Sequence, residues 1–134
     1  MNNEKKKWSD ITILKKIKNP TKKKYNIKIV QDPEKGGDPM TFDGVKFQPD
    51  FAYLTVDYVP SNYIIELKSY KLYLYQFRRK ILSYERLLDV LYNDIMEVYK
   101  PSCLSIQMDV NPRGGIKSIL TINSTDQTET TKQF

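Results

Sequence analysis

The 134-residue sequence predicts an α+β fold in which two helices lie on one face of an antiparallel sheet. Apolar residues alternate with polar ones, or form β-branched runs, on both sides of a central stretch. That central stretch, residues 69–101, has apolar residues at helical spacing instead. The predicted order is a short strand, a hairpin, two helices and a second hairpin. Because a small open sheet leaves edge strands unpaired, we expect copies of the chain to assemble.

The first strands are predicted on either side of a long loop. Residues 25–31 alternate as a half-buried strand does, and residues 32–47, with three Gly and two Pro, are predicted to form a loop. Residues 51–58 and 63–66 are two β-prone runs separated by a turn at Pro60. We expect these two runs to pair as an antiparallel hairpin.

Two helices follow. The first is predicted from about Ser69, with Leu72, Tyr75 and Phe77 on its apolar face. Ser83 is a suitable N-cap for the second helix, and Pro101 ends it. The apolar face predicted for this second helix consists of Tyr84, Leu88, Leu91, Ile95 and Val98.

The last two strands are predicted at residues 104–110 and 116–122, joined by a turn at 111–115. We therefore place the folded domain at residues 25–123 and a polar, frayed tail at residues 124–134.

A basic N-terminal arm is predicted at residues 1–24, which contain nine Lys against Glu4 and Asp10. Such an arm is either a solvated, partly disordered leader or a weak contact for a nucleic-acid backbone.

The composition excludes several classes of site. The chain has no His, so zinc sites built on His, Ser-His-Asp triads and Cys-His dyads are excluded, and we expect no metal. Its single Cys cannot form an internal disulfide, and the N-terminus lacks the apolar stretch of a secretory signal. No apolar run reaches the roughly 20 residues of a spanning helix. We expect a soluble, cytoplasmic protein without a membrane partner.

Three strings of the sequence carry a resemblance to a known family: QPDFA at residues 48–52, ELKSYKLYLYQFR at 66–78, and NPRGGI at 111–116. In this order they resemble the QueF family of NADPH-dependent nitrile reductases, which convert 7-cyano-7-deazaguanine to its aminomethyl form. The resemblance covers roughly residues 43–116. It implies the tunnelling fold, in which ββααββ units close into oligomeric barrels with purine sites between subunits.

The resemblance also implies site residues. The purine-anchoring glutamate of the family falls on Glu85, and one carboxylate can accept hydrogen bonds from both N1–H and the 2-amino group of a guanine-like ring. Glu66 and Ser69 match positions near the pocket. The basic positions associated with NADPH phosphates fall on Lys68, Lys71 and Arg113.

Two positions depart from the family pattern. Asp43 stands where the reductases have the cysteine that adds to the nitrile, seven residues before Asp50, which matches the family aspartate. Tyr84 stands where they have a proton-relay histidine, and Cys103 lies in a later strand. A carboxylate is a poor nucleophile toward a nitrile, so these departures indicate a changed reaction.

The reaction predicted from these departures is decarboxylation of 7-carboxy-7-deazaguanine without a cofactor. Asp43 would protonate C7, with its pKa raised by burial and by the substrate carboxylate, and Asp50 would position or recharge it. Lys46 and Lys68 would orient the substrate carboxylate, and Tyr84 would donate a hydrogen bond to it.

Two alternatives stay open at this stage. One is an NADPH-dependent reductase with an unconventional nucleophile, for which Lys68, Lys71 and Arg113 would hold the cofactor. The other is a catalytically silent subunit that binds a deazapurine or, through its basic arm, a nucleic acid.

Overall fold

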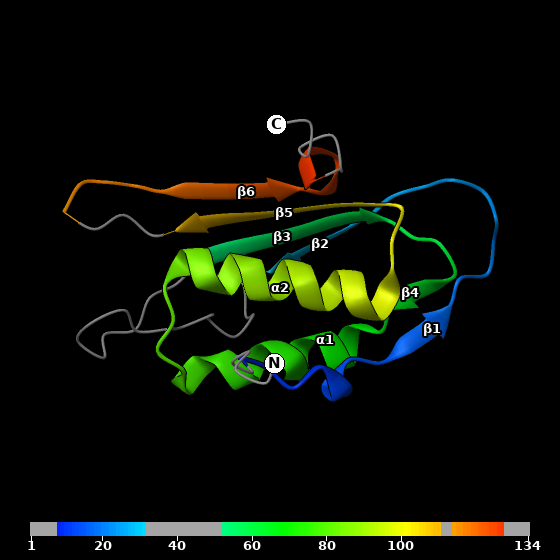
Figure 1. Ribbon diagram of the computed structural model, residues 1–134, viewed down its shortest axis with the longest axis horizontal. Helices are drawn as coiled ribbons and strands as arrows, with labels where there is room; N and C mark the ends of the chain where they lie inside the picture. The colour runs from blue at the N-terminus through cyan, green and yellow to red at the C-terminus, as the bar shows by residue number, and fades with distance from the viewer. Residues whose placement is uncertain (1–7, 32–51, 111–113, 128–134) are drawn as a thin grey trace, which may run out of the picture.

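The computed structural model describes residues 8–31, 52–110 and 114–127 of the chain. Sheet and helices are arranged as expected for an α+β fold with two helices (Figure 1). In chain order the elements, with η for a 3₁₀ helix, are η2 (Ile11–Ile13), β1 (Lys16–Lys18), β2 (Ile27–Gln31), β3 (Ala52–Val59), β4 (Tyr63–Ile65), α1 (Leu67–Tyr75), η4 (Gln76–Arg79), α2 (Tyr84–Tyr99), β5 (Cys103–Val110), β6 (Ile119–Asn123) and η5 (Ser124–Gln127).

The main sheet has the strand order β2-β3-β5-β6, and every neighbouring pair is antiparallel. β3 and β5 lie in the centre, and their register places Val56 opposite Ile106. The chain therefore makes two strands, passes through two helices and returns to make two more strands. This is the predicted ββααββ order.

Alternation along the central strands separates a core face from an outer face. Every second residue of β3 and of β5 is buried, as expected for strands with one covered face. Tyr70, Tyr73 and Leu87 from the helices belong to the same core, so both helices lie on this side of the sheet (Figure 1). The β3 and β5 residues of this core are Ala52, Leu54, Val56, Tyr58, Leu104, Ile106, Met108 and Val110.

The predicted hairpin between residues 51–58 and 63–66 is wrong. β4 pairs with β1 in a separate two-stranded sheet, with Ile17 opposite Ile64. Both edges of β3 are occupied by β2 and β5, so no edge is left for β4. The Tyr58 hydroxyl instead accepts a hydrogen bond from the backbone N–H of Ile65 at 2.9 Å, and this contact fixes the turn between the strands.

The apolar face predicted for the first helix is also wrong in part. α1 begins at Leu67, two residues before the predicted start, with Glu66 as its N-cap, and the buried residues of the helix are Ser69, Tyr70, Tyr73 and Leu74. Phe77 is buried as predicted, whereas Leu72 is 47% exposed. Several sets of residues at i, i+3, i+4 spacing could form the apolar face of this helix. Tertiary packing determines which of them faces the sheet.

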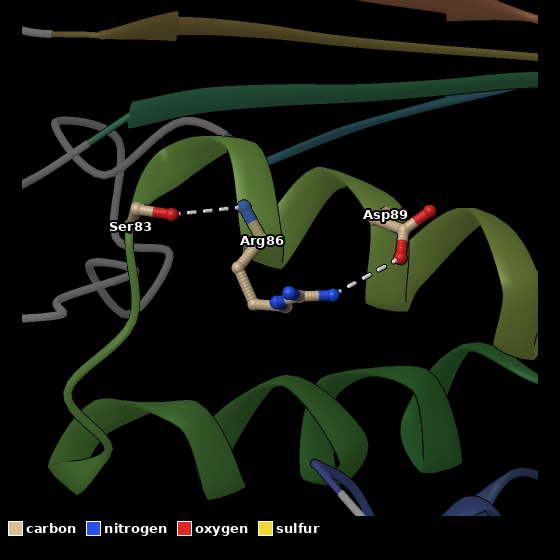
Figure 2. Close-up of polar contacts among 3 residues, drawn as sticks. All are labelled: Ser83, Arg86 and Asp89. Carbon is tan, nitrogen blue, oxygen red and sulfur yellow. Dashed lines mark hydrogen bonds and ion pairs between the residues drawn. The ribbon is translucent and has the colours of Figure 1, made fainter. Parts of the chain in front are cut away.

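α2 begins as predicted. The Ser83 hydroxyl accepts a hydrogen bond from the backbone N–H of Arg86 at 3.0 Å (Figure 2). Leu91 and Ile95 of the predicted face are buried, but the face is rotated. The buried positions are Leu87, Val90, Leu91, Asp94, Ile95 and Tyr99, and the predicted residues Tyr84, Leu88 and Val98 are only partly buried against the core. None of the helices among the described residues is long and apolar enough to span a membrane.

Part of the predicted arm is folded. Residues 8–24 include η2 and β1, and Leu14 is buried in the core. The Lys15 N–H donates to Ser69 Oγ at 2.9 Å, and the carbonyl of Lys15 accepts from the Tyr99 hydroxyl at 2.7 Å. Leu14 and the backbone of Lys15 thus anchor this segment on the core and the helices. The predicted tail is ordered at its start, where Ser124 Oγ accepts from the Leu104 N–H at 2.9 Å.

A buried carboxylate joins the N-terminal segment to both helices. Asp94 of α2 is 9% exposed, and its Oδ2 accepts hydrogen bonds from Ser9 Oγ and from the Tyr73 hydroxyl, each at 2.5 Å. Burial raises the pKa of Asp94 above its ordinary value, although the two hydrogen bonds oppose this shift. The buried Tyr73 hydroxyl thereby has the partner that burial requires.

Replacing Asp94 tests this junction. Asp94→Ala removes the acceptor of a buried hydroxyl, so we expect the free energy of unfolding to fall by about 1–3 kcal/mol in urea denaturation. Asp94→Asn keeps an oxygen acceptor and should cost less.

The pH dependence gives a second readout. Because the pKa of Asp94 is raised, the folded chain holds this proton more tightly than the unfolded chain does. Its favourable contribution therefore decreases as pH rises from about 4 through the raised pKa. The stability of Asp94→Asn relative to the native chain should rise over this range, and a constant difference between pH 4 and 7 would contradict the assignment.

Candidate functional site

The first turn of α2 presents Glu85 to solvent. Ser83 caps the turn, and the neighbouring Arg86 turns along the helix to pair with Asp89 at 3.6 Å (Figure 2). The Arg86 guanidinium also lies 5.1 Å from the centre of the Trp8 ring. Within the described part of the chain, no hydrogen bond or ion pair occupies the exposed Glu85 carboxylate. This carboxylate is therefore available to accept hydrogen bonds from a ligand.

Tyr84 precedes Glu85 and is half-buried against the core. Its side chain packs against the hydrophobic core, which is a packing role. The predicted hydrogen bond from Tyr84 to a substrate stays a prediction.

The start of α1 holds four predicted site residues. The Glu66 carboxylate accepts from the backbone N–H groups of Ser69 at 2.8 Å and of Lys68 at 3.3 Å, which is the geometry of an N-cap. The hydrogen bond from the Ser69 N–H, followed by smaller contributions that include the Lys68 ammonium, holds the pKa of Glu66 below its ordinary value. Glu66 is thus an ionised capping residue.

Ser69 is buried and makes two hydrogen bonds. Its hydroxyl donates to the carbonyl of Glu66 at 2.8 Å and accepts from the Lys15 N–H at 2.9 Å. This arrangement ties the helix start to the N-terminal segment. A role for Ser69 in substrate binding stays a prediction.

Lys68 and Lys71 lie three residues apart on α1 and are both exposed. The Glu66 carboxylate already accepts hydrogen bonds from two backbone N–H groups of the first turn, those of Lys68 and Ser69. Any phosphate bound at this helix start would therefore be held by the lysine side chains.

Within a single chain, Glu85 at the start of α2 lies far from Lys68 and Lys71 at the start of α1. α1 begins beside β4, whereas α2 begins at the other end of the helix layer (Figure 1). A helix of 16 residues, such as α2, is about 24 Å long. Asp43, Lys46, Asp50 and Arg113 lie outside the described residues.

Cys103 lies at the start of β5, beyond the C-terminal end of α2, and so does not approach Glu85 in the same chain. It lines a cavity of about 200 Å³, and the other lining residues are Asp57, Tyr58, Val59, Leu104, Ser105, Asn123, Ser124 and Thr125. The sequence analysis did not find this cavity, because strands distant in sequence build it.

The described residues contain no cluster of acidic or Cys side chains able to hold a metal ion.

Comparison with known proteins identifies the family. A family model described as QueF-like protein matches residues 49–129, which is more than half of the chain. The chain belongs to the QueF-like protein family. The resemblance read from the three sequence strings is thereby confirmed.

Two relatives show how far the similarity extends. The NADPH-dependent 7-cyano-7-deazaguanine reductase of Prochlorococcus marinus (strain NATL2A) is 40% identical over 74 residues, 55% of this chain and 53% of the relative. The reductase of the same name from Aquifex aeolicus (strain VF5) is 37% identical over 76 residues, 57% of this chain and 59% of the relative. The chain therefore spans between half and two thirds of the length of these curated relatives.

A solved structure supports the fold. The apo form of the archaeosine synthase QueF-Like superposes with a TM-score of 0.60 over 75% of this chain and 91% of that chain, at 12% identity. At this identity the likeness concerns the fold alone. The predicted tunnelling fold is confirmed for the single chain.

The comparisons overturn the predicted reaction. Relatives 33–40% identical to this chain are named NADPH-dependent 7-cyano-7-deazaguanine reductases, so a cofactor-free decarboxylase with Asp43 as proton donor is contradicted as the main interpretation. The two departures from the family pattern, at Asp43 and Tyr84, do not outweigh the similarity of the rest of the matching segment. The 7-deazaguanine chemistry is printed in the names of these relatives.

Ser69→Ala separates the two roles considered for this residue. Removing the hydroxyl leaves the Lys15 N–H without its acceptor, so we expect the free energy of unfolding to fall by about 1–3 kcal/mol. Ser118→Ala, at an exposed position, is the matched control and should change stability little. If Ser69→Ala leaves stability intact but weakens substrate binding, the structural role is wrong.

Proposed function

We propose that this chain binds 7-cyano-7-deazaguanine and reduces its nitrile to the aminomethyl group with NADPH. The activity printed in the names of its relatives supports the reaction class. The observation that carries the binding half is the exposed, unoccupied carboxylate of Glu85 at the start of α2.

Glu85 suits a guanine-like ring for a chemical reason. Such a ring presents two N–H donors side by side, and an ionised carboxylate accepts both with charge-assisted hydrogen bonds. The neighbouring cation, Arg86, is engaged with Asp89 and the Trp8 ring, so it does not neutralise Glu85. The helix N-terminus stabilises negative charge at this position.

The residues at the start of α1 fit the phosphates of NADPH. Lys68 and Lys71 place two exposed ammonium groups on neighbouring positions of one helix. Glu66 caps the helix and keeps its first turn ordered beneath them. When bound, NADPH supplies the hydrides that a nitrile needs to become an amine.

We further propose that one site combines Glu85 of one subunit with Lys68 and Lys71 of another. The support is geometric, since α1 and α2 begin at opposite ends of the helix layer in one chain (Figure 1). A ring or barrel of subunits would bring opposite ends together and would also pair the edge strands β2 and β6.

The direct test incubates the full chain with 7-cyano-7-deazaguanine and NADPH. We expect loss of NADPH absorbance at 340 nm and a product with the mass of the aminomethyl base. Binding of the base without NADPH oxidation would contradict the reductase and leave a deazapurine-binding protein. Asp43 stands where the reductases have their cysteine, so binding without reduction is the main alternative to the proposed activity.

Glu85→Gln is expected to weaken binding of 7-cyano-7-deazaguanine by about 10- to 100-fold in isothermal titration calorimetry. The substitution removes the charge from two hydrogen bonds and places an amide donor against a ring donor. Glu97→Gln, which removes an exposed carboxylate from the same helix, is the matched control. Equal affinity of Glu85→Gln and the control would contradict the anchoring role.

Lys68→Ala/Lys71→Ala is expected to raise the KM for NADPH about 2- to 20-fold, as the loss of two exposed ion pairs predicts, with little effect on affinity for the base.

Mixing the Lys68→Ala/Lys71→Ala variant with Glu85→Gln should restore activity, because a shared site draws each intact half from a different subunit. No recovery after subunit exchange would contradict the shared site.

A further inference from the structure

The segment from β1 to β2 is rich in lysine. Between Asp10 and Asp32 the chain has seven Lys and no acidic residue, whereas residues 32–134 have a small net negative charge. All seven side chains are exposed. We call them the lysine surface; they are Lys15, Lys16, Lys18, Lys22, Lys23, Lys24 and Lys28.

The backbone that carries the lysine surface is held in place. β1 pairs with β4, and β2 pairs with β3. Between β1 and β2, the Asn19 side chain donates to the carbonyl of Ser61 at 2.8 Å and accepts from the Tyr25 hydroxyl at 2.8 Å. The connection therefore passes around the β4 end of the molecule as an ordered segment (Figure 1).

No carboxylate of a described residue forms an ion pair with any of the seven ammonium groups. Asp57, the cross-strand neighbour of Lys28, instead accepts a hydrogen bond from the Asn26 side chain at 2.8 Å. An unneutralised set of cations on an ordered surface favours a polyanionic partner.

An aromatic ring lies within the lysine surface. The ammonium of Lys16 is 4.6 Å from the centre of the Tyr63 ring, and Tyr63 is 38% exposed. Lysines interleaved with an exposed aromatic ring are the combination by which proteins hold single-stranded nucleic acids, because the ring can stack on a base. An anionic membrane is less suited, since the lysines lie on short strands and a connection rather than on an amphipathic helix.

We propose that the lysine surface binds the phosphate backbone of a single-stranded nucleic acid, with the Tyr63 ring stacking on a base. This binding is independent of the nitrile reduction proposed above. It carries the nucleic-acid contact considered for the basic arm, residues 1–24, on lysines of the ordered segment 15–28.

The test measures binding of the full chain to a labelled 20-nucleotide single-stranded DNA by fluorescence anisotropy at 50–200 mM KCl. With three to seven phosphate contacts, the slope of log K against log salt should be about −2 to −5. Lys22→Gln/Lys23→Gln/Lys24→Gln should reduce this slope by about 2 and weaken binding about 10- to 100-fold near 0.1 M salt. Circular dichroism checks that the variant is folded.

Two controls make the result specific. Lys80→Gln/Lys100→Gln/Lys117→Gln removes the same charge elsewhere and should weaken binding less than about threefold. Tyr63→Leu should weaken single-strand binding about fivefold or more, because stacking is lost, and should not affect duplex binding. Equal losses in the two triple variants, an unaffected single-strand affinity in Tyr63→Leu, or tighter binding to phosphatidylserine vesicles than to DNA would each overturn the proposal.

Discussion

The backbone of Lys15 is the point on which the arrangement of this chain depends. Its N–H donates to Ser69 Oγ at 2.9 Å, and its carbonyl accepts from the Tyr99 hydroxyl at 2.7 Å and from the Glu66 N–H at 3.2 Å. These contacts join the N-terminal segment to the start of α1 and to the end of α2. Because buried polar groups are paired in folded proteins, displacing the Lys15 backbone would leave the Tyr99 hydroxyl and the Glu66 N–H without this acceptor, so the contacts at this junction depend on one another.

The junction also positions the charged surfaces. With Glu66 held as the cap of α1, Lys68 and Lys71 point outward from the first turns of the helix. With β1 fixed against β4, the lysine surface continues from the same end of the molecule. Glu85 lies at the opposite end, where Ser83 caps α2. The chain thus separates its cationic end from the carboxylate that suits a purine.

Family membership and local chemistry give different kinds of information about function. The family match and the reductase names concern a segment of just over half the chain. The carboxylate at Glu85 and the lysines of α1 agree with that chemistry. The substitution of the family cysteine concerns one step of the reaction, the addition to the nitrile, and this step lies outside the residues that the structure describes. Binding and turnover are therefore separable questions for this chain.

The sequence by itself determined the α+β class, the ββααββ order, the Ser83 cap and the family, because capping residues, alternation and ordered motifs are local patterns. Only the tertiary structure decided that β4 pairs with β1, that Ser69 is buried and that residues 8–24 belong to the fold. Strand partners and buried faces depend on contacts between residues far apart in the chain. Local periodicity carries no information about those contacts.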